Sequence, residues 1–242
     1  MKKEDIIENK DPDQVMIKLD AVSKIYKGNF PALEDINLEI QAGEFISIVG
    51  QSGSGKSTLL KLIYAEEMAT NGEVYFKGEL LNGLSRRKLP YHRRNIGTVF
   101  QDFKLLPKKT AYENVAYALE VAGVTDEEIK ESVQQILDIV GLGEKTEKYP
   151  YQLSGGEQQK VAIARALVHT PMVIIADEPT GNLDPVSSLE IVQLLIRINE
   201  LGTTVVLASH DKDIVDRVNR RVLVLEKGRI IADYAKGKYK IS

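Results

Sequence analysis

The sequence predicts an α/β fold with a parallel core sheet, an antiparallel β flank and an inserted all-helical subdomain. Along the chain, the spacing of apolar residues alternates between two, typical of strands, and 3.6, typical of helices. A largely apolar strand, residues 45–49, runs straight into a glycine-rich turn and then a helix pattern. Between Thr110 and Gly143 the pattern is helical without a strand signal, which predicts a helical insertion of about residues 103–168.

In the first half, alternating apolar residues indicate half-exposed strands that suit an antiparallel flank, whereas residues 45–49 indicate a more buried strand. The strands predicted here cover residues 15–19, 36–40, 45–49, 74–76 and 96–100, and a helix covers residues 56–64.

In the second half, Thr110 is a candidate helix cap, and residues 126–140 form a helix with acids in its first turn, stopped by Gly141 and Gly143. Residues 172–176 are continuously apolar, as expected of a strand covered on both faces. The remaining predicted elements are a helix that follows Ser154 and extends to about residue 168, a helix over residues 185–201, and strands over residues 204–208, 222–225 and 230–231.

Composition limits the class of protein. The chain has 242 residues, 43% apolar and 28% charged, with a formal net charge of −3. This length suits one large domain, here residues 15–242, and the mildly acidic balance argues against a nucleic-acid-binding protein. The chain has no cysteine, which excludes disulfides and thiolate metal sites.

Membrane-spanning and targeting segments are not expected from the sequence. No stretch approaches the roughly 20 apolar residues that cross a bilayer. Residues 1–14 are too polar for a signal peptide and are expected to form a short disordered leader. Any membrane role is therefore expected to come through a partner.

The glycine-rich turn matches the P-loop pattern G-x-x-x-x-G-K-[ST] without a mismatch. It consists of Gly50, Gln51, Ser52, Gly53, Ser54, Gly55, Lys56 and Ser57. Glycines let the backbone wrap a phosphate with its N–H groups pointing inward, and the following helix adds its positive N-terminus. Lys56 can reach the β- and γ-phosphates, and the Ser57 hydroxyl can bind Mg²⁺. A turn without a ligand is the alternative, but the place between a buried strand and a helix favours a nucleotide site.

Two acids end the continuously apolar strand. Asp177 and Glu178 would reach the C-terminal edge of a parallel sheet, where such folds bind ligands. We assign Asp177 to the Mg²⁺ side and Glu178 as the base that positions and polarises the attacking water. For this dipeptide alone a solvated strand end before Pro179 would be the better interpretation, but the P-loop favours the catalytic one.

A third motif, residues 153–159, reads Leu-Ser-Gly-Gly-Glu-Gln-Gln and is called the signature segment below. Ser154 is a good helix N-cap, and Gly155 and Gly156 leave bare N–H groups that can bind an anion. Taken alone, the segment is only a capped helix. With a P-loop upstream and Asp-Glu downstream, however, the chain resembles the ABC (ATP-binding cassette) ATPases.

This resemblance implies further site residues. Gln101 matches the glutamine that contacts Mg²⁺ and the water, and residues 181–184 match the D-loop, which touches the opposite subunit. His210 matches the switch histidine at the γ-phosphate, and Tyr26 the aromatic ring that stacks on adenine. Thr58 completes the nucleotide-binding set. By itself His210 is more typical of a surface residue and Tyr26 of a core residue.

The resemblance also implies a homodimer with ATP and Mg²⁺ at its interface. In this family the signature segment of one subunit covers the ATP held by the P-loop of the other, so Ser154, Gly155 and Gly156 would donate to a γ-phosphate in trans. The chain has one P-loop and one signature segment, so two copies are needed. A single cassette without a coiled-coil insertion disfavours the DNA-repair, chromosome-structure and translation-factor branches.

Within the family, residues 88–107 and 110–116 resemble the bacterial cell-division ATP-binding proteins of the FtsE type. This implies a peripheral subunit on the cytoplasmic side of the cell membrane that drives an FtsX-type integral membrane partner. The pair would regulate septal peptidoglycan hydrolases without carrying cargo and without binding nucleic acid. Transmission would use a groove near Gln101 and the helical insertion. Its candidate apolar positions are Tyr112, Val115, Leu119 and Val121.

Three alternatives remain open. Lipoprotein-release and macrolide-export ATPases share the Gly-Asn-Leu-Asp of residues 181–184, although residues 93–97 and 100–102 favour cell division. A soluble ATPase switch acting on a nucleic acid or a cytosolic protein is disfavoured by the acidic charge balance and the single cassette. A non-hydrolysing cassette is disfavoured because the full set of catalytic residues is present: Lys56, Asp177, Glu178 and His210.

Overall fold

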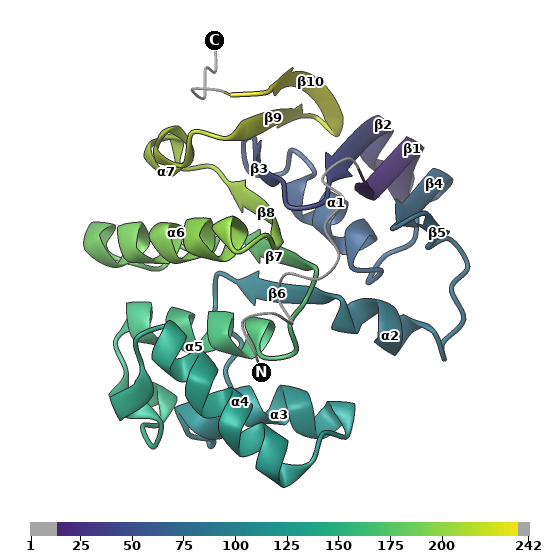
Figure 1. Ribbon diagram of the computed structural model, residues 1–242. Coiled ribbons are helices and arrows are strands. Elements are labelled where there is room, and N and C mark those ends of the chain that lie inside the picture. Colours follow the sequence, from purple (N-terminus) through teal and green to yellow (C-terminus); the bar gives the residue numbers. More distant parts are fainter. Residues whose placement is uncertain (1–13, 237–242) are drawn as a thin grey trace.

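A computed structural model describes residues 14–236, so the predicted leader lies outside the described residues except for Gln14. The chain forms two β-sheets with helices between and beside them (Figure 1). The strands are β1 (Val15–Tyr26), β2 (Phe30–Gln41), β3 (Phe45–Val49), β4 (Asn71–Phe76), β5 (Glu79–Leu80), β6 (Ile96–Phe100), β7 (Val173–Asp177), β8 (Thr204–Ser209), β9 (Arg221–Glu226) and β10 (Arg229–Tyr234). The helices are α1 (Lys56–Ile63), α2 (Leu89–Arg94), α3 (Ala111–Ala122), α4 (Asp126–Ile139), α5 (Gly155–Leu167), α6 (Pro185–Glu200) and α7 (Lys212–Val218).

The predicted sheet arrangement is confirmed. A six-stranded sheet has the order β10-β9-β3-β8-β7-β6, and its strands are parallel except for β10, which pairs antiparallel with β9. A second, four-stranded antiparallel sheet has the order β2-β1-β4-β5. The fold is therefore α/β with an antiparallel flank, as the two apolar periods indicate.

The six-stranded sheet is covered on both faces, which explains why its strands are almost wholly apolar. Successive residues of β8 point to opposite faces. Val205 and Leu207 join the core formed with α3 to α7, while Val206 and Ala208 join the core formed with α1 and the antiparallel sheet. Figure 1 shows α1 between the two sheets and α5, α6 and α7 on the other side of the six-stranded sheet.

The residues between β6 and β7 form helices only, as predicted. Three of these helices begin with a capping box, in which the cap hydroxyl and a glutamate three residues later satisfy backbone N–H groups reciprocally. Their caps are Thr110 for α3, Thr125 for α4 and Ser154 for α5. The predicted caps at Thr110 and Ser154 are thus both present.

Some elements escape the sequence pattern for physical reasons. Strands β1 and β2 are longer than predicted because bulges, with left-handed residues at Ala21 and Asp35, break the alternation that reveals a strand. Helix α2 is too short to show a helical period and buries a single side chain, His92, whose Nε2 lies 2.9 Å from the carbonyl oxygen of Ile63. Helix α7, capped by Asp211, is also absent from the sequence prediction.

Over residues 14–236 the structure contains no helix with the length and apolarity needed to cross a bilayer.

Candidate functional site

Four parallel strands end together at one edge of the six-stranded sheet. Val49 of β3 pairs with Ser209 of β8. Asp177 of β7 pairs with Ala208 of β8 and with Phe100 of β6. The segments that leave this edge carry the P-loop, Gln101, Glu178 and His210. The sheet register therefore brings together residues that are up to about 160 positions apart in the sequence, at the edge where parallel sheets bind ligands.

Two P-loop glycines are required by close backbone contacts. A Cβ on Gly50 would lie 2.2 Å from the carbonyl oxygen of Leu225. Gly55 has a φ of 109°, and its Cβ would lie 2.7 Å from the carbonyl oxygen of Ala32. Helix α1 begins directly after Gly55 without a side-chain cap, so the N–H groups of its first turn are free for an anion.

Lys56 is held in place by contacts within the chain. Its side chain is only 5% exposed, and Nζ donates to the carbonyl oxygens of Gly50 at 2.8 Å and Gln51 at 3.2 Å. The same Nζ lies 3.7 Å from Oε1 of Glu178. A buried ammonium with two carbonyl partners and one carboxylate neighbour is preorganised for a phosphate, because little side-chain freedom remains to be lost on binding.

Glu178 lies at the centre of the site. It is a non-glycine residue with a left-handed φ of 49°, a strained conformation that is often found at functional positions. Its Oε1 faces Lys56, and its Oε2 lies 2.9 Å from Nδ1 of His210. The structure thus brings three predicted catalytic residues into one chain of contacts.

Asp177 lies beside the start of α1. The Ser57 hydroxyl forms a hydrogen bond with the carboxylate of Asp177. One oxygen of that carboxylate, Oδ1, is buried without a hydrogen-bond partner. Burial raises the pKa of Asp177, and the charge of Glu178 acts in the same direction, while the Ser57 bond opposes them. An orphaned carboxylate oxygen next to a hydroxyl is a donor set that a hard cation prefers.

Gln101 points toward the D-loop instead of toward Ser57 and Asp177. Its Nε2 donates to Oδ1 of Asn182 at 3.1 Å, and Nδ2 of Asn182 donates back to the Gln101 carbonyl at 3.0 Å. A Cβ on Gly181 would lie 2.7 Å from Gln101 Nε2, so a larger residue there would displace this amide. Within the described residues no hydrogen bond joins Gln101 to the other two predicted metal ligands.

The signature segment is separate from the P-loop of the same chain. Ser154 is exposed and caps α5 by accepting from the Glu157 N–H at 3.3 Å. The two glycines instead pack on the D-loop side: a Cβ on Gly155 would lie 3.2 Å from Leu183, and one on Gly156 would lie 2.9 Å from Ser187 Oγ. Across residues 14–236, no hydrogen bond or ion pair links the signature segment to the P-loop. The two halves of the predicted phosphate site do not meet within one chain.

Tyr26 is the last residue of β1 and is partly exposed, so it is not a core residue. Lys24 Nζ lies 5.1 Å from the centre of its ring. An accessible ring at the end of a strand can stack on a base, as the resemblance to the ABC family implies.

We expect Tyr26→Ala to weaken ATP binding about tenfold, because stacking of a base on an aromatic ring contributes about 1–3 kcal/mol. The kcat at saturating ATP should stay near the wild-type value, since the ring does not touch the phosphates. Equilibrium titration with ATP measures the change, and Tyr26→Phe, which keeps the ring, is the matched control. Wild-type affinity in Tyr26→Ala would rule out this ring as the adenine platform.

A cavity of about 360 Å³ opens next to Glu178 and His210. It is lined beyond them by residues of α6, by the D-loop, and by Asp211, Asp213 and Arg217 at α7. The site therefore has open space beside its catalytic contacts.

Sequence reasoning placed Gln159 in the signature segment without a role of its own and did not single out Arg165, yet both side chains hold the catalytic segments in place. Gln159 is buried and Arg165 partly buried, and both lie on α5 and donate to backbone carbonyls of the catalytic segments. The sequence did hold a signal for Gln159. It lies three residues before Ala162 and four before Ile163, so its polar side chain falls on the apolar face of the helix.

Comparison with known proteins gives consistent matches. Residues 33–181 match the family model described as ABC transporter. The chain is 50% identical over 224 residues to the cell division ATP-binding protein FtsE of Bacillus subtilis, covering 93% of this chain and 98% of that protein. It is 51% identical over 226 residues to FtsE of Mycobacterium tuberculosis, with the same coverage of 93% and 98%.

Among solved structures, the chain resembles a dimeric ATP-binding cassette in a post-hydrolysis state bound to ADP and phosphate. The TM-score is 0.83 at 41% identity, covering 91% of this chain and 98% of that one. The protein cbiO1 from Clostridium perfringens, part of the ABC transporter complex cbiONQ, has a TM-score of 0.86 at 33% identity, with coverage of 92% and 89%.

Proposed function

The chain belongs to the ABC transporter family of ATP-binding cassettes and is an ATPase of that family, and from this premise we propose that it works in bacterial cell division. Two copies hold ATP and Mg²⁺ between them on the cytoplasmic side of the membrane. Hydrolysis then drives an FtsX-type membrane partner that regulates septal peptidoglycan hydrolysis. Relatives that align with nearly the whole of this chain are named as cell-division ATP-binding proteins, which supports the assignment.

The observation that carries the enzymatic part is the contact of one carboxylate, Glu178, with both Lys56 and His210 at the sheet edge. When ATP fills the P-loop, Lys56 turns its charge to the β- and γ-phosphates and releases Glu178. Glu178 then accepts a hydrogen bond from a water, and His210 steadies its other oxygen.

In the reaction the water oxygen forms a bond to the γ-phosphorus, and the bond to the bridging oxygen of ADP breaks. ADP leaves with that electron pair, and the water proton passes to Glu178. Lys56 stabilises the negative charge that develops on the transferred phosphoryl group.

The residues beside the P-loop fit a Mg²⁺ ion. The unpartnered Oδ1 of Asp177 and the Ser57 hydroxyl are oxygen ligands of the kind Mg²⁺ prefers, and Gln101 would join them after leaving Asn182. Over residues 14–236 no group of three or more His, Cys, Asp or Glu side chains forms a metal site, so phosphate oxygens and water would complete the coordination. Bound Mg²⁺ would neutralise charge on the phosphates.

The homodimer follows from the separation of the signature segment from its own P-loop. Ser154 is exposed at the N-terminus of α5. Over residues 14–236 the signature segment makes no hydrogen bond or ion pair with the P-loop of its own chain. A second copy related by two-fold symmetry completes both sites at once. The dimeric cassette with 41% identity supports this arrangement.

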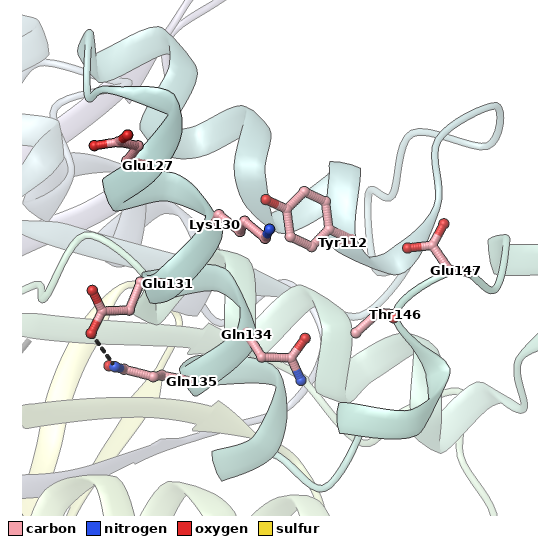
Figure 2. Close-up of a pocket in the computed structure, with 8 residues that line it drawn as sticks. All are labelled: Tyr112, Glu127, Lys130, Glu131, Gln134, Gln135, Thr146 and Glu147. Carbon is pink, nitrogen blue, oxygen red and sulfur yellow. Dashed lines mark hydrogen bonds between the residues drawn. The ribbon is translucent and has the colours of Figure 1, made fainter.

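For the membrane partner we propose a docking pocket on the helical part. A pocket of about 660 Å³ lies between α4, the start of α3 and the segment at Thr146 (Figure 2). Its charged lining has three carboxylates and one ammonium, from Glu127, Glu131, Glu147 and Lys130. Cytoplasmic segments of membrane proteins are rich in lysine and arginine, so this acidic lining suits the partner by charge.

Of the four apolar positions predicted for the groove, two are accessible and two are buried. Tyr112 lines the pocket and Val121 is 65% exposed. Val115 and Leu119, in contrast, are 0% and 6% exposed and belong to the core between α3, α4 and α5. They face inward because they lie four residues apart, on the side of α3 that packs on α5.

Co-purification from gently solubilised membranes tests the biological assignment. We expect the tagged chain to bring down an FtsX-type membrane protein, and Glu127→Lys/Glu131→Lys to lose it while ATPase activity is kept. Glu200→Lys, at an exposed acid on α6, is the control and should retain the partner. Recovery of a lipoprotein-release or macrolide-export subunit would instead assign the chain to that transporter. Recovery of no membrane protein would favour a soluble switch.

A further inference from the structure

Helix α5 holds both catalytic segments from its buried side. Gln159 is 0% exposed, and its Nε2 donates to the Pro179 carbonyl at 2.8 Å and to the Phe100 carbonyl at 3.3 Å. Phe100 comes directly before Gln101, and Pro179 comes directly after Glu178. One side chain therefore bridges the two strand ends that present the predicted catalytic residues.

An amide nitrogen suits this position. The two bridged groups are both carbonyl oxygens, so they cannot bond each other, and the –NH₂ of glutamine offers two donors from one atom. The opposite orientation of the amide would place Oε1 against both carbonyls, where three acceptors would meet. In the observed orientation Oε1 is buried without a partner, so the amide is held by its nitrogen alone.

The same helix also fixes the far end of the Gln101 segment. Arg165 donates from Nη2 to the Phe103 carbonyl at 2.9 Å and from Nη1 to the Lys104 carbonyl at 2.7 Å. Phe103 and Lys104 both have left-handed φ values, 57° and 51°, which non-glycine residues adopt only when held by their surroundings. Gln101 is thus bracketed on both sides by donors from α5.

We propose that Gln159, the last residue of the signature segment, is a positioning residue that fixes Gln101 and Glu178 relative to each other and links both to the N-terminus of α5 in the same subunit. The proposal rests on the roles assigned above to Gln101 and Glu178. Because α5 begins at the signature segment, engagement of its N-terminus with the partner's ATP reaches the chain's own catalytic residues through Gln159. The two ATP sites of a dimer are thereby linked through one helix in each subunit.

The test compares Gln159→Leu and Gln159→Glu with Gln193→Glu, at an exposed glutamine on α6 that serves as the control for the added charge. We expect kcat to fall about 10- to 100-fold in both Gln159 variants, since a displacement of the order of 1 Å can cost that much. The loss should be greater for Gln159→Glu, whose carboxylate would face two carbonyl oxygens. The KM for ATP, the ATP affinity and the ATP-induced dimerisation should stay within about twofold of wild type.

This split between kcat and binding separates positioning from a general loss of structure, which thermal unfolding of each variant checks directly. Wild-type kcat in both Gln159 variants would overturn the proposal. If these variants do not fold, Arg165→Lys gives the independent measurement, because lysine keeps the charge but cannot donate to both carbonyls as a fork. A selective loss of kcat there supports the proposal, and unchanged kinetics contradict it.

The outcome is distinguishable from a failure of the proposed function. If Glu178→Gln hydrolyses ATP normally, the assigned site roles are wrong. If Glu178→Gln is inactive while Gln159 variants are normal, the site roles stand and the positioning role alone is wrong.

Discussion

Glu178→Gln is expected to lower ATP hydrolysis by about 10²- to 10⁴-fold, the usual contribution of a positioned general base. The amide has nearly the same shape as the carboxylate and can still accept from His210, but it cannot take the water proton. ATP binding should be kept or strengthened, because the negative charge that faces Lys56 across 3.7 Å is removed. The variant should therefore accumulate as an ATP-bound dimer.

Phosphate release and light scattering after gel filtration with ATP and Mg²⁺ measure both effects. Glu200→Gln, which neutralises an exposed acid on α6, is the control and should hydrolyse and dissociate like wild type. Normal turnover in Glu178→Gln would mean that another group acts as the base.

Lys56→Ala is expected to abolish nucleotide binding, with a loss of at least about 100-fold in affinity for a buried, charge-assisted phosphate contact. The substitution removes the ammonium that contacts Gly50, Gln51 and Glu178, so it also leaves the Glu178 carboxylate next to the incoming phosphates without a cation. Both effects act against ATP in the same direction.

Titration with ATP gives the affinity, and Lys18→Ala, at an exposed lysine on β1, is the matched control. Thermal unfolding should be followed in parallel, because Lys56 also donates hydrogen bonds to two P-loop carbonyls. An unchanged ATP affinity in a folded Lys56→Ala would remove Lys56 from the site. Lys56→Arg tests whether a positive charge alone is enough for ATP binding. A guanidinium is larger than an ammonium and planar, and Lys56 is only 5% exposed, so this variant should not bind ATP with full affinity.

The sequence alone was sufficient for the fold class and for the local part of the site. The spacing of apolar residues predicts strands and helices, because the position of a residue in the repeat decides which face of the element its side chain lies on. The P-loop can be recognised from the sequence because its eight residues are consecutive. The same local reading failed at β1 and β2, where bulges interrupt the period, and at the short helices α2 and α7.

The tertiary structure decided what depends on register and packing between distant segments. The contact of Glu178 with Lys56 and His210, the pairing of Gln101 with Asn182, and the burial of Val115 and Leu119 are set by which strand ends meet and which helices face one another. The bridging role of Gln159 likewise appears only when β6, β7 and α5 are in place. The sequence states which chemical groups are present, and their local spacing determines on which face of an element they lie. Contacts between residues far apart in the sequence depend on how all the elements pack, so only the folded chain reveals them.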